Sequence, residues 1–182
     1  EDQQKKRRRR FRLPSFGFRK REIDGFILDG DRLTVADNAA FKKEPLKLLK
    51  LFHLAQHHET DIHPHALRLV TQNLKLIDKN LLRDAEANRL FMEMLCGPNP
   101  EVTLMRLNEA GVLGRFIPDF GRVVAQMQYD MYHVYTVDEH TIRAIGILKG
   151  IEDGRLKGDH PAACSVIGEM QSLPALYLAV LL

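Results

Sequence analysis

From Pro45 onwards, apolar residues recur at the spacing of one helix face, and this repetition constrains the fold more than any other feature. In "EPLKLLKLFHLAQHH" the recurring positions are Leu48, Leu51, Phe52 and Ala55. In "HPHALRLVTQNLKLID" they are Leu67, Val70, Leu74 and Ile77. Stripes with a period near 3.6 residues indicate amphipathic helices that bury one face. The pattern therefore predicts a mainly α chain.

Prolines and glycines divide this helical region. Pro45 and Pro64 suit the first turns of helices, and Gly111 suits a left-handed cap at the end of "EVTLMRLNEAG". The stretch "VLGRFIPDFGRVVAQM" is interrupted by glycine and proline, which predicts a broken connector. Further helices are predicted from residue 136 to about residue 152 and over residues 174–182.

A β-hairpin is predicted ahead of the helices. Asp29-Gly30 lies between two short β-prone runs, which is a good hairpin signal. We expect strands over residues 25–28 and 32–35 and no other sheet of any size.

Positive charge is concentrated at the N-terminal end. The 182 residues carry a formal net charge of +3. Residues 1–22 hold ten Lys and Arg against three acids, and the remainder holds 17 against 21, so the body is mildly acidic. This basic segment fits either a solvated linker at the edge of another domain or a phosphate-binding arm, in which Phe11, Phe16 and Phe18 could stack on bases.

Composition points to a cytoplasmic protein. Cys96 and Cys164 lie far apart without metal-like spacing, as expected of thiols in a reducing compartment rather than of a disulfide framework. We expect them to be buried. We expect no membrane span, because no apolar run reaches ~18 residues, and no secretory leader. The first residue is not Met, so we expect a piece of a longer chain.

Most of the candidate chemical groups have a structural explanation. His57-His58 and the pair His63 and His65 contain metal-binding residue types, but adjacent helical residues point about 100° apart. No acid accompanies them in a recognised pattern, so surface or capping roles are favoured. Neither a glycine-rich phosphate loop nor a G-x-S-x-G nucleophile motif occurs.

His140 is the histidine whose role spacing leaves open. Thr136 and Glu139 have the spacing of a capping box, which predicts Thr136 as the N-cap of a helix. His140 then lies in the first turn and shares an apolar face with Ala144, Ile147 and Ile151. We expect this face, and the imidazole with it, to point inward. A core histidine bonded to a carbonyl and a metal ligand both fit, although one imidazole cannot hold a divalent ion alone.

Long phrases of the sequence resemble the bacterial [protein-PII] uridylyltransferase/uridylyl-removing family. They are "MYHVYTVDEHTIRAIG", the preceding "RLNEAGVLGRFIPDFGRVVAQMQYD", and, further upstream, "DGDRLTVADNAAFKKEPLKLLKLFHLAQ" and "DAEANRLF". The resemblance covers nearly all of residues 25–182. Residues 1–22 match more loosely.

The resemblance implies a domain order. In the family a nucleotidyltransferase domain is followed by a helical connector, an HD-type metal-dependent hydrolase domain and two glutamine-sensing ACT domains. The chain would comprise a basic segment over residues 1–22, a hairpin and helical connector domain over 23–128, and the truncated start of the HD domain over 129–182. The implied fold is mainly α, with a small β-hairpin.

The resemblance also implies a chemistry. The parent would transfer UMP from UTP to a tyrosine of the PII signalling protein and remove it by hydrolysis. His140 matches the first HD histidine, a ligand of Mg²⁺ or Mn²⁺ whose partners would lie beyond Leu182. The transferase motif and the His-Asp pair are absent, so we expect the fragment itself to be inactive.

Two alternatives remain open from the sequence. A tRNA nucleotidyltransferase also joins a transferase head to helical and HD modules, although "GVLGRFIPDFGRV" favours the PII-modifying family. A helical nucleic-acid-binding module would use the basic residues 5–21. We expect no membrane partner and do not favour a nucleic-acid partner.

Overall fold

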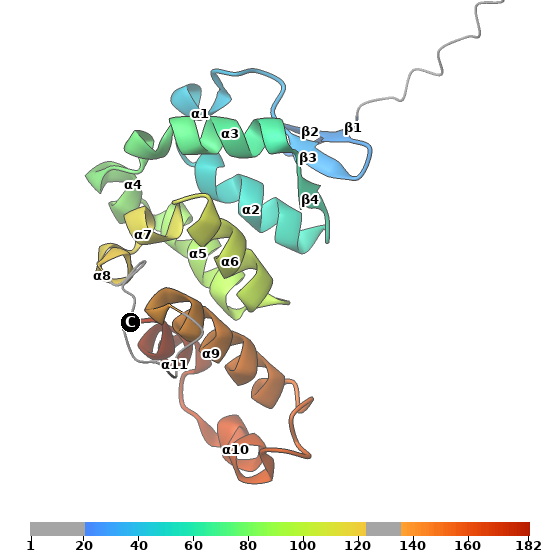
Figure 1. The fold of residues 1–182 in the computed structure, drawn as a ribbon, viewed down its shortest axis with the longest axis vertical. Coiled ribbons are helices and arrows are strands. Elements are labelled where there is room, and N and C mark those ends of the chain that lie inside the picture. Colours follow the sequence, from blue (N-terminus) through green and yellow to red (C-terminus); the bar gives the residue numbers. More distant parts are fainter. Residues whose placement is uncertain (1–20, 123–135) are drawn as a thin grey trace, which may run out of the picture.

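A computed structural model of the chain describes residues 21–122 and 136–182, which form a mainly helical structure with a small sheet at one end (Figure 1). The sheet has the order β1-β2-β3-β4, with strands at Arg21–Ile23, Phe26–Asp29, Arg32–Thr34 and Asp61–Ile62. β1, β2 and β3 pair antiparallel, and β4 pairs parallel with β3.

The predicted hairpin is confirmed as β2 and β3. Asp29 pairs with Arg32 across the turn, and Gly30 takes a φ of +66°, which favours glycine. The sheet is larger than predicted, because β1 and β4 extend the hairpin on either side. Both are short, and β4 has only two residues, so neither carries a periodicity that the sequence could reveal.

The helices form two groups (Figure 1). The first comprises α1 (Ala40–Lys43), α2 (Lys47–His57), α3 (Pro64–Gln72), α4 (Lys79–Arg83), α5 (Ala85–Cys96), α6 (Pro100–Glu109), α7 (Leu113–Phe116) and α8 (Pro118–Gly121). The second comprises α9 (Val137–Glu152), α10 (Pro161–Val166) and α11 (Leu173–Leu181). Two 3₁₀ turns lie at Leu74–Leu76 and Ile167–Glu169. No helix of the described ranges is long and apolar enough to cross a membrane.

Helix boundaries follow local chemistry. Asp78 and Asp84 accept backbone N–H groups at the starts of α4 and α5, so each caps its helix. Gly111 has a φ of +75° and ends the turn after α6, as predicted. The predicted helix after Pro64 is shorter than its stripe suggested. It ends at Gln72, and the Asn73 side chain then donates to the Leu69 carbonyl at 2.8 Å.

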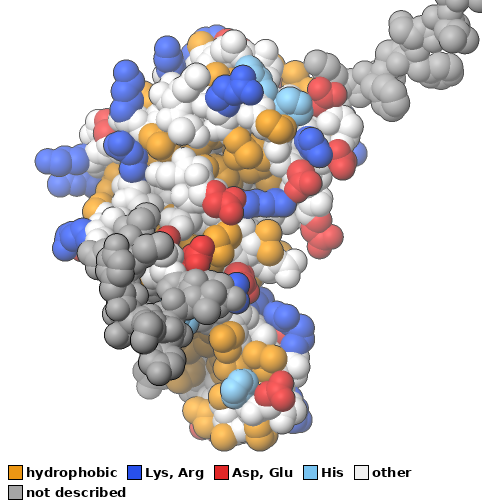
Figure 2. Space-filling view, viewed as in Figure 1, with side chains coloured by type: hydrophobic (Ala, Val, Ile, Leu, Met, Phe, Trp, Pro, Cys, Tyr) orange, Lys and Arg blue, Asp and Glu red, His pale blue; other side chains and the backbone are white. Residues whose placement is uncertain are grey.

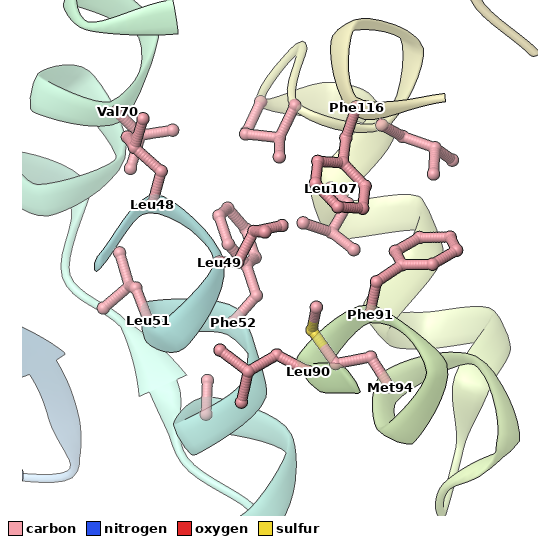
Figure 3. Packing of buried hydrophobic residues seen from close by; sticks show 14 of the residues in the cluster. Leu48, Leu49, Leu51, Phe52, Val70, Leu90, Phe91, Met94, Leu107 and Phe116 are labelled. Atoms are coloured by element: carbon pink, nitrogen blue, oxygen red, sulfur yellow. The ribbon is translucent and has the colours of Figure 1, made fainter. Parts of the chain in front are cut away.

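The core lies between α2, α5 and α6 (Figure 3). The predicted stripe of α2 is buried throughout, with Leu48, Leu51, Phe52 and Ala55 at most 2% exposed. In Figure 3 Phe52 lies toward Leu90 of α5, whereas Leu48 lies beside Val70 of α3. Full burial of a Leu or Phe side chain contributes about 1.5–3 kcal/mol, so this layer is a main source of the stability of the first helix group.

The second helix group is built on α6. α9 packs against α6 and α11, and α11 also contacts α5. Ile142 and Ile145 of α9 are fully buried in this contact. α10 contributes no buried residue.

A polar junction fixes α11 against the end of α9. The Tyr177 hydroxyl donates to Glu152 Oε2 at 2.6 Å, and Lys149 Nζ donates to the same oxygen at 3.1 Å. Lys149 also pairs with Asp153 at 3.0 Å. Burial of Tyr177, together with the Glu152 carboxylate, raises the pKa of its hydroxyl. For Lys149 burial opposes the charge, but the hydrogen bonds that its Nζ donates to Asp153 and Glu152 outweigh burial and raise the pKa.

We predict that Tyr177→Phe destabilises the chain at pH 7 and makes its free energy of unfolding less sensitive to alkaline pH. Losing a hydrogen bond to a charged acceptor should lower the free energy of unfolding by about 1.5 kcal/mol at pH 7. A tyrosine with a raised folded-state pKa stabilises the fold below its unfolded pKa near 10, and this contribution is lost as the pH rises further. Urea unfolding at pH 7, 9 and 11 should therefore show a smaller loss above pH 9 for the variant, by about 1 kcal/mol. Equal losses for both proteins would contradict this account.

Candidate functional site

His140 lies in the first turn of α9, as predicted. Thr136 is the N-cap residue, and its carbonyl accepts the His140 backbone N–H at 3.0 Å. The Thr136 side chain makes no capping hydrogen bond, however, so the capping-box prediction locates the helix start but not its stabilisation. Asp138 and Glu139 in the first turn place negative charge near the positive end of the helix dipole, which stabilises this end of the helix instead.

The prediction that His140 points inward is wrong. His140 is exposed, and Ile147 on the same face is 51% exposed. α9 packs instead through Asp138, Ile142 and Ile145, which are buried. The buried stripe and the stripe of His140 have the same spacing. Because the buried stripe begins with a carboxylate, a prediction from apolar content alone chose the other face. Figure 2 shows hydrophobic side chains gathered on the surface over α9 and α10.

Asp138 is the buried charge of this region. It is 5% exposed, and within residues 21–122 and 136–182 no other charged residue is buried to this degree. Asn108 of α6 donates from Nδ2 to Asp138 Oδ2 at 2.7 Å. A charge removed from water is tolerated only when hydrogen bonds replace its hydration. The bond from Asn108 therefore ties the first turn of α9 to α6.

A second point of α6 holds α9 near its middle. The Glu101 side chain lies so close to Gly146 that a Cβ there would be 2.0 Å from Glu101 Oε2 and 3.0 Å from Glu101 Cβ. Gly146 thus permits the two helices to approach closely. Sequence reasoning missed Asn108, Asp138 and this contact, because none of them belongs to an apolar stripe or a known motif.

The other histidines have structural surroundings in the described chain. His63 is the N-cap of α3 and accepts the His65 backbone N–H at Nδ1, so the capping role is confirmed for His63. The His65 ring contacts Asn38 Oδ1 at 3.0 Å. The His57 and His58 rings meet edge to face at 5.0 Å. No group of three potential metal ligands comes together within the ranges that the structure describes.

The two cysteines are less buried than predicted. Cys96 and Cys164 are free thiols, and both are half-buried. Partial burial, with a smaller contribution from Glu152, raises the pKa of the Cys96 thiol, which disfavours the reactive thiolate. Neither thiol lies beside His140 in sequence or shares a helix with it.

A hollow of about 300 Å³ lies between β4, α3 and α6. Arg106 on its wall pairs with Asp61 at 2.5 Å and donates to the Thr60 carbonyl at 3.3 Å. No residue of α9 lines this hollow, so it is separate from the site around His140.

Two predictions fall outside the described residues. The basic segment and its nucleic-acid alternative concern residues 1–22, of which only residues 21 and 22 are described, in β1. The predicted domain boundary at residues 128 and 129 also lies outside the described ranges. Both stay predictions.

Comparison with known proteins gives consistent matches. The chain is 58% identical to the bifunctional uridylyltransferase/uridylyl-removing enzyme of Azospirillum brasilense, over 90% of the chain and 18% of that protein. The proteins of the same name from Rhodospirillum rubrum and Novosphingobium aromaticivorans are 56% and 48% identical over the full chain, which covers 19% and 20% of them. The chain thus spans about a fifth of these relatives. No solved structure matches it.

A family model covers the part of the chain from β2 to α7. This model, described as the third domain of uridylyltransferase GlnD, matches residues 26–116, which include the hairpin, the α2–α5–α6 core and Asn108. α9 and His140 follow the matched range. The relatives favour this assignment over a tRNA nucleotidyltransferase. The chain belongs to the uridylyltransferase GlnD family.

Proposed function

We propose that the chain is a segment of a bifunctional enzyme that transfers UMP from UTP to a tyrosine of the PII signalling protein and removes it by hydrolysis. The names of three relatives, each at least 48% identical, support both reactions. Since the chain spans about a fifth of those proteins, the complete activity belongs to a protein of their length. Transfer of UMP from UTP and the response to glutamine take place in other parts of that protein. It acts in the cytoplasm.

Within this enzyme, His140 is a ligand of a divalent ion, Mg²⁺ or Mn²⁺, for the removal reaction. The observation that carries this role is its exposed position in the first turn of α9, on the side of the helix away from α6. An accessible imidazole can offer a ring nitrogen to an ion. Asp138 does not share this role, because it is buried and accepts a bond from Asn108.

One imidazole fits such an ion only as part of a larger set of donors. The remaining ligands would follow Leu182. In Figure 1 the C-terminal end of α11 lies at the end of the helix pair where α9 begins, so a continuing chain would start close to the first turn of α9. A bound ion would supply an activated water and neutralise charge on the phosphodiester. The segment alone would catalyse neither reaction.

We predict that His140→Ala in the full-length protein abolishes removal of UMP and leaves its transfer largely intact. Loss of one of a few converging ligands should weaken the site by orders of magnitude, whereas transfer uses a separate domain. The rate of removal is measured on uridylylated PII and the rate of transfer on unmodified PII. His160→Ala is the matched control, because His160 is also exposed and makes no side-chain cap bond in α10. Normal removal by the His140 variant would refute the ligand role.

The isolated chain should bind Mn²⁺ weakly. A site that holds only one of its ligands predicts a dissociation constant on the order of millimolar or weaker. Calorimetric titration of the 182-residue chain at pH 7.5 tests this, with the His140→Ala variant as the reference. A stoichiometric site in the micromolar range would contradict an incomplete site and would direct attention back to His57, His58, His63 and His65.

A further inference from the structure

We propose that Asn108 is a positioning residue for the removal reaction, through which the third domain sets the direction of His140. This inference rests on the proposed ligand role of His140. Asn108 lies in α6, inside the range that matches the family model, whereas Asp138 and His140 lie in α9, beyond it. The hydrogen bond from Asn108 Nδ2 to Asp138 Oδ2, 2.7 Å long, therefore joins the matched domain to the helix that carries the ligand.

Helix geometry links this hydrogen bond to the direction in which the His140 imidazole points. Each residue turns an α-helix by about 100°, so Asp138 and His140 point about 160° apart around the axis of α9. When Asp138 is held on α6, His140 must face away from α6. A rotation of α9 about its axis would turn both side chains together.

Apolar packing cannot supply this directional restraint by itself. Ile142 and Ile145 bury apolar surface against the rest of the fold, but apolar contacts have little directional preference. A hydrogen bond to a buried carboxylate does depend on direction. Glu101 against Gly146 adds a second fixed point and prevents α9 from sliding.

Stability alone does not account for a carboxylate in this contact. The interactions of a buried charge offset only part of the free energy that its dehydration costs. Apolar replacements of buried ionic groups are therefore often neutral or stabilising. Polar groups in such places can instead select one arrangement among several packings. At the start of α9, the arrangement selected is the one that presents His140 to the exposed side.

The test uses the full-length protein and measures Mn²⁺ binding by calorimetric titration, together with the dependence of UMP removal on Mn²⁺ concentration. Asn108→Ala should raise the Mn²⁺ concentration for half-maximal removal about tenfold, as is typical when a group that orients a ligand is lost. The rate at saturating Mn²⁺ and the rate of UMP transfer should stay within about twofold of wild type. Asn108→Gln keeps an amide donor and should recover part of the loss.

Two further variants separate positioning from general destabilisation. Asn38→Ala removes another side-chain amide contact, the one between Asn38 Oδ1 and the His65 ring, far along the chain from α9, and should leave the Mn²⁺ dependence unchanged. In an Asp138→Ala background, Asn108→Ala should have no additional effect, because Asn108 acts through Asp138.

The outcomes distinguish this inference from the proposed function. If Asn108→Ala behaves like Asn38→Ala while His140→Ala abolishes removal, the positioning role is wrong and the ligand role stands. If Asn108→Ala lowers removal and transfer equally without changing the Mn²⁺ dependence, Asn108 is a stability residue and the inference is overturned. If His140→Ala leaves removal intact, the proposed function fails first.

Discussion

The proposed role of His140 depends on the contact between α6 and α9. α6 belongs to the α2–α5–α6 core, so its position is fixed by fully buried side chains such as Leu104 and Leu107. α9 packs on α6 through one stripe, in which Asp138 makes a polar contact and Gly146 a close approach. Everything that the second helix group presents to its surroundings, including His140, follows from which side of α9 this stripe occupies.

Much of the fold could be predicted from the sequence because its signals are local. The hairpin at Asp29-Gly30, the left-handed turn at Gly111 and the start of α9 after Thr136 each depend on a few adjacent residues. The buried stripe of α2 could be read for the same reason, since its apolar residues have no competing face. β1 and β4 escaped prediction because strands this short are defined by their pairing partners rather than by their own pattern.

The orientation of α9 could not be read from periodicity. Stripes starting at Asp138 and at His140 have the same spacing, and the second is the more apolar along its length. One interaction that holds the observed side is the bond from Asn108 to Asp138, thirty positions later in the chain, and a pairwise contact between distant residues leaves no trace in a hydrophobic pattern. The general rule that charged residues face solvent favoured the wrong side, because Asp138 is an exception made possible by its partner.

The corrected orientation suits a ligand better than the predicted one. A histidine buried against α6 would be out of reach of donors from other segments. On the opposite side of α9, the same residue stands among Ala144, Ile147 and Ile151, an apolar surface that further chain can cover. Under the proposed ligand role, an apolar surrounding would lower the local dielectric and strengthen the attraction between the ion and its ligands. Asp138 and His140 thus lie on opposite faces of α9, and their two-residue offset lets one helix anchor to the third domain and still present an imidazole on its exposed side.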